Sequence, residues 1–151
     1  MSGRRRPVRR WAGALAALAA GVVLAARRAR LEPMLVQGES MLPTLRPGQR
    51  IAVGPPKRPL RRGAVVVVRH PARDGLEVVK RVVGLPGERV HLADGHPDAV
   101  LGPDEYLVLG DHREASTDGR AFGPVGWERI VGVVRFAYWP PRRLRVSAHA
   151  R

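Results

Sequence analysis

The chain has 151 residues, no cysteine and a formal charge of +14, which comes from 27 basic and 13 acidic side chains. This length predicts one domain, and a hydrophobic fraction of 44% supplies enough apolar side chains for a packed core. The lack of cysteine excludes disulfide bonds and thiolate chemistry. The charge is concentrated at the ends, because residues 1–30 hold eight Arg and residues 142–151 hold four, whereas residues 31–141 carry 15 basic and 13 acidic groups. The body is therefore nearly neutral.

The N-terminal part is a basic stretch followed by an uncharged one. Residues 11–26 carry no charge and, as a helix, would span about 24 Å, against ~30 Å for the hydrocarbon core of a bilayer. A short transmembrane anchor, an Ala-rich surface helix and a cleavable signal peptide are the three interpretations, and the last lacks a good cleavage site. We expect the anchor. Five Arg precede it and three follow it, which favours residues 1–10 as a cytoplasmic tail and a body on the extracytoplasmic side of the plasma membrane.

From residue 33 onward, short β-branched runs alternate with Gly and Pro. We expect strands at 49–53, 64–69, 76–83, 89–92, 106–109 and 130–138, with residues 70–75 forming the loop of a hairpin. No helical period of useful length follows residue 31. Regularly spaced short strands predict a mainly β domain, a barrel or sandwich, over residues 33–140, with residues 141–151 as a basic C-terminal tail.

Lys80 stands out in the third of these strands. Alternation along the strand places it on the same face as three apolar residues, Leu76, Val78 and Val82. One interpretation is an edge-strand lysine that snorkels to water. The other is a buried amine whose pKa is lowered, so that its neutral form acts as a general base. Arg cannot do this, and Lys80 is one of only two lysines among the 27 basic residues.

Two loops also contain residues that a plain β domain does not need. The first, residues 38–45, carries Ser40 among Gly and Pro, where serine is usually only a turn residue. The second, residues 109–123, is a polar loop of alternating charge that contains Ser116, the only other serine in the body. A solvated surface loop is the alternative interpretation of this second segment.

Taken in order, the three segments resemble the motifs of type I signal peptidases. They read Gly-x-Ser-Met-x-Pro-Thr-Leu at 38–45, Lys-Arg-Val-x-Gly-x-Pro-Gly-Glu at 80–88, and Gly-Asp-x-Arg-x-x-Ser-x-Asp-x-Arg-x-x-Gly-x-Val at 110–125. The resemblance covers residues 33–140. Each motif alone is weak, but three in the same order are specific.

The resemblance implies a Ser/Lys protease. The Ser40 hydroxyl would attack the scissile carbonyl, and Lys80, as a neutral amine, would accept the hydroxyl proton and later protonate the leaving amine. Ser116 matches the serine that orients the lysine, and the backbone N–H of Ser40 matches an oxyanion donor. The remaining matches are two supporting ion pairs, Arg81 with Asp111 and Asp118 with Arg120.

The chain departs from the family pattern at several positions. Gly38 stands where some members carry a hydroxyl residue in the oxyanion hole, which leaves the second donor unassigned. His112 replaces the usual Asn and Gly119 the usual Ser. Only 21 residues separate Gly84 from Tyr106, so the inserted subdomain of larger members must be minimal.

The histidines suggest two other kinds of chemistry. His70, His91, His96 and His112 lack the spacing of a zinc signature, and no nucleophile elbow surrounds Ser40 for a His-based triad. We therefore expect neither a metal nor another cofactor.

Three functions follow from these features. The leading hypothesis is a membrane-anchored endopeptidase whose partners are the lipid bilayer and precursor proteins with N-terminal signal peptides. The second hypothesis is a maturation protease that uses the same Ser/Lys chemistry to trim a single precursor, such as that of nickel superoxide dismutase. An inactive basic module that binds membrane surfaces or nucleic acid is the alternative from another class. No nucleic acid is expected, because the body is nearly neutral and the chain has only seven aromatic residues.

Overall fold

The structure is a computed structural model that describes residues 18, 20–24, 30–92 and 98–142. The chain divides into two units, residues 1–31 and residues 32–151. In the first unit, residues 18 and 20–24 are helical and exposed. The helices of the described residues are all too short or too polar to cross a bilayer. The predicted tail at 1–10, residues 143–151 of the predicted tail at 141–151, most of the predicted anchor and His96 lie outside the described residues.

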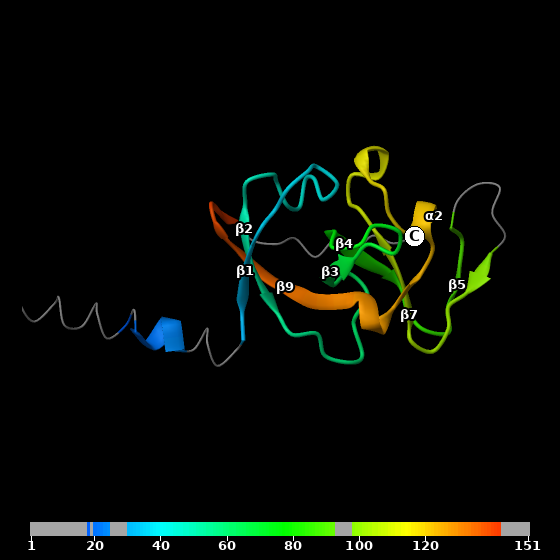
Figure 1. The fold of residues 1–151 in the computed structure, drawn as a ribbon, viewed down its shortest axis with the longest axis horizontal. Coiled ribbons are helices and arrows are strands. Elements are labelled where there is room, and N and C mark those ends of the chain that lie inside the picture. The colour runs from blue at the N-terminus through cyan, green and yellow to red at the C-terminus, as the bar shows by residue number, and fades with distance from the viewer. Residues whose placement is uncertain (1–17, 19, 25–29, 93–97, 143–151) are drawn as a thin grey trace, which may run out of the picture. The chain divides into compact units, whose positions relative to one another are not determined.

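The second unit is mainly β, as predicted (Figure 1). Its strands are β1 (Glu32–Leu35), β2 (Arg50–Gly54), β3 (Val65–Arg69), β4 (Glu77–Gly84), β5 (Arg89–Val90), β6 (Ala99–Val100), β7 (Glu105–Leu109), β8 (Val125–Gly126), β9 (Ile130–Trp139) and β10 (Pro141–Arg142). Three short helices complete it: η1 (Arg113–Ala115), α2 (Gly119–Phe122) and η2 (Trp127–Arg129).

Eight strands form one curled sheet in the order β1-β2-β9-β3-β4-β7-β8, with β10 paired to β9. All pairings are antiparallel. The two ends of the sheet do not pair within the described residues, so the predicted barrel or sandwich is corrected to a half-barrel. The strands β5 and β6 form a separate hairpin, seen at one end of the unit in Figure 1.

The six expected strands are present, with ends that differ by one or two residues. The hairpin loop after β3 is also confirmed, because β3 and β4 pair directly. The first strand, β1, was not predicted. Its second residue is Pro33, which lacks an N–H donor and is accepted only at an edge or at the start of a strand. β1 is the terminal strand of the sheet, where Pro33 removes no pairing that the sheet requires.

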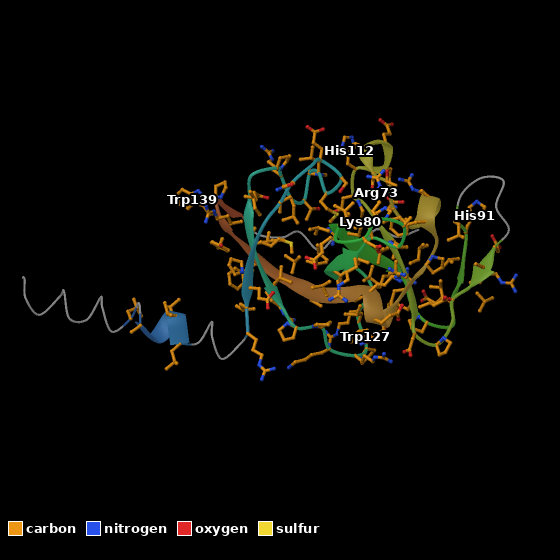
Figure 2. All side chains as sticks on the ribbon, viewed as in Figure 1. Arg73, Lys80, His91, His112, Trp127 and Trp139 are labelled. Atoms are coloured by element: carbon orange, nitrogen blue, oxygen red, sulfur yellow. The ribbon has the colours of Figure 1, made fainter. Side chains whose placement is uncertain are left out.

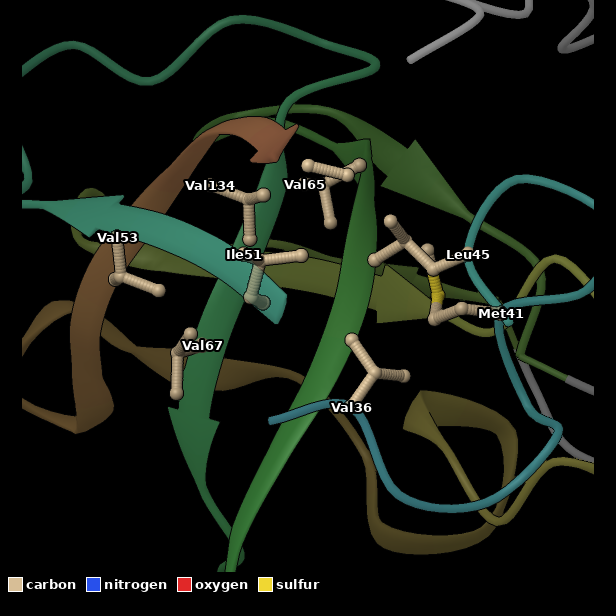
Figure 3. Packing of buried hydrophobic residues seen from close by; sticks show 9 residues of the cluster. Val36, Met41, Leu45, Ile51, Val53, Val65, Val67 and Val134 are labelled. Atoms are coloured by element: carbon tan, nitrogen blue, oxygen red, sulfur yellow. The ribbon is translucent and has the colours of Figure 1, made fainter. Parts of the chain in front are cut away.

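The valine run of β3 is buried on both faces. Val65 and Val67 belong to one apolar cluster, which also contains Ile51 (Figure 3). Val66 and Val68 belong to a second cluster on the other face. A continuous apolar run rather than an alternating one is what a strand covered on both sides requires. The sheet therefore has a core on each side at β3, and β4 lies directly beside it.

We predict that Ile51→Ala lowers the free energy of unfolding by about 2–5 kcal/mol, because Ile51 is fully buried and its loss leaves a cavity. Leu35→Ala is the control. Leu35 is 51% exposed in the adjacent strand, and its truncation should change stability by less than about 0.5 kcal/mol. Urea unfolding of the full chain in detergent measures both, and equal effects would contradict the assignment of this core.

Candidate active site

The loop that carries Ser40 is anchored by its apolar residues. Met41 and Leu45 are buried in the first apolar cluster, and the Leu45 N–H donates to the Met41 carbonyl at 2.8 Å. Ser40 itself is only half-buried. This loop therefore holds a serine at the surface on a backbone whose next residue is fixed in the core.

Lys80 is buried, with 3% of its surface exposed. It lies on the face of β4 that carries Val78 and Val82, as the alternation predicts, and both valines pack in the second apolar cluster. Figure 2 shows Lys80 in the interior of the unit. An exposed, snorkelling lysine does not describe this position. Its Nζ donates to the Ser116 hydroxyl at 3.1 Å.

Burial lowers the pKa of Lys80, because the charged ammonium loses hydration in this environment. The nearby Asp118 carboxylate acts in the opposite direction, and the Arg120 guanidinium lowers the Lys80 pKa further. The net direction is downward, which favours the neutral amine that a general base must provide.

Asp118 accepts a hydrogen bond from Ser116, the partner of Lys80, and is completely buried. Burial acts to raise its pKa, but hydrogen bonds from Arg120, the Gly110 amide and the Ser116 hydroxyl together lower it. The Gly110 N–H donates to Asp118 Oδ2 at 2.8 Å, and Arg120 Nε donates to Oδ1 at 3.0 Å. Asp118 also caps α2 by accepting from the Arg120 amide. A connected polar network thus links Lys80, Ser116, Asp118 and Arg120.

Arg81, the neighbour of Lys80, lies within a second network. Its guanidinium donates to both carboxylate oxygens of Asp111, at 2.8 and 2.6 Å, to the Gly63 carbonyl at 2.8 Å and to the Thr44 hydroxyl at 3.1 Å. Burial acts to raise the Asp111 pKa, but the hydrogen bonds from Arg81 and Thr44 lower it overall. Arg81 therefore joins β4 to both the Ser40 loop and the polar loop.

Gly110 is the point where the two loops meet. A Cβ at this position would lie 2.2 Å from Ser116 Oγ and 2.6 Å from the Ser40 carbonyl oxygen. The His112 N–H donates to that same carbonyl at 3.0 Å. Because only glycine fits here, the Ser40 backbone can approach the hydroxyl that binds Lys80.

The Ser40 backbone N–H donates no hydrogen bond within the described residues. This leaves it free for the oxyanion role that the resemblance implies. Gly38 has a φ of +76°, a conformation that strains residues with a side chain. A serine or threonine at that position would therefore carry a conformational cost. No hydrogen bond between Ser40 and Lys80 is found; such contacts are often long before a substrate binds.

A groove of about 310 Å³ has Ser40 in its lining. It is lined by the end of β1 and the residues after it on one side and by the start of β4 on the other: Met34, Leu35, Val36, Gln37, Gly38, Ser40, Met41, Leu76, Glu77, Val78 and Val79. In the described chain, β7 pairs with β4 only from Arg81 onward, so residues 77–80 have a free edge. β1 has one as well, since it pairs only with β2.

The three described histidines, His70, His91 and His112, form no metal-binding cluster. His91 lies on the β5 hairpin, away from Lys80 (Figure 2), and within the described chain no three metal-binding side chains cluster. His70 is buried against the Phe122 ring, and burial lowers its pKa, as do Arg73 and Lys80. His112 Nδ1 is buried without a hydrogen-bond partner among the described residues, a cost of about 1–3 kcal/mol.

Sequence reasoning missed several residues of this region. Thr44 and Gly110 were inside the quoted motifs but were given no role, and no residue was assigned to substrate binding. The tight approach at Gly110 joins segments far apart in sequence, so no local pattern reports it. Thr44 could have been considered, because its hydroxyl follows Ser40 in a loop that must be held.

Comparisons with known proteins show the family to which the chain belongs. Residues 8–96 and 92–139 match the family model described as "Signal peptidase, peptidase S26". Signal peptidase IB from Staphylococcus aureus strains COL and Mu50 is 30% and 32% identical over 148 residues, which cover 72% of this chain and 78% of the relative. Signal peptidase I of Leptolyngbya laminosa is 33% identical over 144 residues, covering 75% and 71%.

A crystal structure of signal peptidase I from Enterococcus faecalis V583 is 26% identical, with a TM-score of 0.42, and covers 52% of this chain and 98% of that one. The extended family match and the identity to the curated relatives define the class of this protein, which is a serine endopeptidase. The chain belongs to the signal peptidase family, peptidase S26.

We predict that Gly110→Ala lowers kcat/KM on a precursor by about 100-fold or more, because its methyl group forces apart the Ser40 backbone and the Ser116 hydroxyl. Gly126→Ala is the matched control. The three atoms nearest to its Cβ all belong to the exposed Glu128 carboxylate, which can move, so activity should change little.

If Gly110→Ala lowers stability too far for assay, Ser116→Ala tests the same contact, since it removes the hydroxyl that binds Lys80 and leaves the backbone unchanged. Full activity in that variant would contradict an orienting role for Ser116.

Proposed function

We propose that this chain is a membrane-anchored signal peptidase that cleaves N-terminal signal peptides from exported precursors with a Ser40/Lys80 dyad. The observation that carries the proposal is the buried Lys80 amine, whose pKa is lowered and which donates to Ser116 beside the backbone of Ser40. No other lysine lies in the core of the described residues, and Arg cannot replace it as a base.

Each residue then has a step in peptide hydrolysis. Ser40 Oγ attacks the scissile carbonyl carbon, and its proton passes to Lys80 Nζ. The Ser40 N–H donates to the oxyanion of the tetrahedral intermediate. As the C–N bond breaks, Lys80 returns the proton to the leaving amine, which produces the mature N-terminus. Water then attacks the acyl ester, again with Lys80 as the base, and frees Ser40.

The groove supplies a place for the substrate. An extended peptide between the free edges of β1 and β4 would gain main-chain hydrogen bonds as an added strand. The groove is lined largely by apolar side chains such as Val36, Met41 and Val79, which suits the small residues that the family favours one and three positions before the cut.

Features of each unit support a site at the bilayer. In the first unit, Leu18, Val22, Val23 and Leu24 are between 53% and 67% exposed on a helical segment. In the second, Leu35 of β1 and Trp139 of β9 each pair with Arg50 of β2, which lies between them, and both are more than half exposed. Trp beside Arg is typical of a surface at the lipid headgroup level.

The two alternatives differ in client and in chemistry. A maturation protease would use the same dyad on a single precursor, and no finding specifically supports it. An inactive basic module would leave unexplained the hydrogen bond between the buried Lys80 amine and Ser116.

We predict that Ser40→Ala, Lys80→Ala and Lys80→Arg each abolish cleavage of a secretory precursor in detergent, because the first removes the nucleophile and the others remove a base that can be neutral. Lys57→Ala, at an exposed position, is the control and should retain full activity. In wild-type protein, kcat/KM should rise with pH as Lys80 loses its proton, with a midpoint below the ordinary lysine pKa of about 10.4.

Cleavage that persists in Lys80→Ala would overturn the dyad. Cleavage of only one cytosolic precursor, with secretory precursors left intact, would favour the maturation protease. Loss of activity in Lys57→Ala would point to a general effect of removing positive charge.

We predict that the full chain sediments with membranes and resists extraction by high salt, and that deletion of residues 1–30 moves most of it to the supernatant. The reason is that this segment contains the uncharged stretch that we propose as the anchor. Immunoblots of fractionated cells measure the distribution, and a full chain found in the supernatant would contradict the anchor.

A further inference from the structure

We propose that Glu77 gives the peptide groove a preference for a basic client residue four or five positions before the scissile bond. The inference rests on the proposed function, since it assumes that the client segment before the cut lies in the groove. It adds a specificity determinant that neither the motifs nor the catalytic groups contain.

Glu77 is the only charged residue among those that line the groove. The other polar ones are Gln37 and Ser40, and the rest are apolar or glycine. Glu77 is exposed and forms no ion pair within the described part of the chain. Its carboxylate therefore sets the sign of the charge at this end of the groove.

The strand geometry fixes how far Glu77 lies from the reaction. It precedes Lys80 by three residues on β4, which is about 10 Å at ~3.3 Å per residue. Alternation places Glu77 on the same face as Val79, which packs against the cluster that contains Met41, the neighbour of Ser40. Counted from the residue directly before a scissile bond at Ser40, an extended client would thus pass Glu77 three or four residues further back, at its fourth or fifth position before the cut.

Nearby basic groups limit the size of the effect. Arg69 lies directly opposite Glu77 across the β3–β4 pair, and Arg73 lies in the connecting loop. Neither lines the groove, so a client residue would meet the carboxylate before it meets a guanidinium. Because the site is exposed and screened, we expect a preference of about two- to fivefold rather than an absolute requirement.

The experiment uses the full chain in detergent and a series of otherwise identical peptide substrates. Lys, Gln or Glu is placed in turn at the fourth and fifth positions before the cut, and the first and third positions keep small residues. With wild-type protein, at one or more of these positions, kcat/KM for the Lys peptide should exceed that for the Glu peptide by about two- to fivefold, mainly through KM, and high salt should reduce this ratio.

Two variants and a control test the assignment. Glu77→Gln should bring the Lys and Glu peptides to equal kcat/KM, and Glu77→Lys should reverse the order. Asp74→Asn removes a negative charge from the same hairpin, outside the groove lining, and should keep the wild-type preference. If Glu77→Lys is unstable beside Arg69, the uncharged variant still decides the question.

The outcomes separate the two proposals. Equal cleavage of all peptides by wild-type protein, or a preference that survives in Glu77→Gln, would overturn the inference and leave the signal peptidase proposal intact. A preference lost equally in Asp74→Asn would assign it to the general charge of the hairpin and would also overturn it. No Ser40-dependent cleavage of any peptide or precursor would instead count against the proposed function itself.

Discussion

The candidate active site depends on the hydrogen bonds of the Arg81 guanidinium. It binds Asp111 through two hydrogen bonds and also holds Thr44 and the Gly63 carbonyl, so one buried side chain connects β4 with three loops. A buried ion pair is not in itself a strong source of stability, because both charges lose their hydration. Its fixed planar geometry instead specifies where the loops lie relative to β4. Without it, the Ser40 loop would be held mainly by apolar contacts of Met41 and Leu45, which are less directional.

Lys80, the residue before Arg81, lies in an environment that disfavours a charged side chain. Arg81 donates to the Asp111 carboxylate, whereas Lys80 is buried among valines and donates to a neutral hydroxyl. Lys80 and Arg81 are consecutive in β4, so their side chains point to opposite faces of the sheet and contact different networks. Asp118 affects the charge of Lys80. Its negative charge acts to raise the Lys80 pKa, but its own bonds to Arg120 and the Gly110 amide spread that charge. The site thus keeps a carboxylate close to the amine for geometry while burial still favours the neutral amine.

Much of the fold could be predicted from sequence, because β-branched runs and Gly/Pro turns are local signals. Strand alternation also placed Lys80 on its apolar face. The curvature of the sheet could not be predicted, since it arises from bulges such as those between β2 and β9. The strand β1 was missed because Pro33 weakens its pattern. The groove was missed for a different reason: it exists only when β1 and β4 face each other across a gap, and no local pattern records which strands leave an edge free. The partners of Arg81 and Asp118 came from the family resemblance rather than from spacing.

The free edges of β1 and β4 have a consequence for turnover. If the client completes the sheet as an additional strand, its attraction to the protein comes largely from its backbone, which every extended peptide shares. Broad client range then follows from the architecture and does not require a large recognition surface. The same contacts remain after the bond is cut, because the part of the peptide before the scissile bond keeps all of them. In that case the cleaved leader competes with the next precursor for the groove. The rate at which the leader dissociates from the sheet then sets an upper limit on the rate of processing.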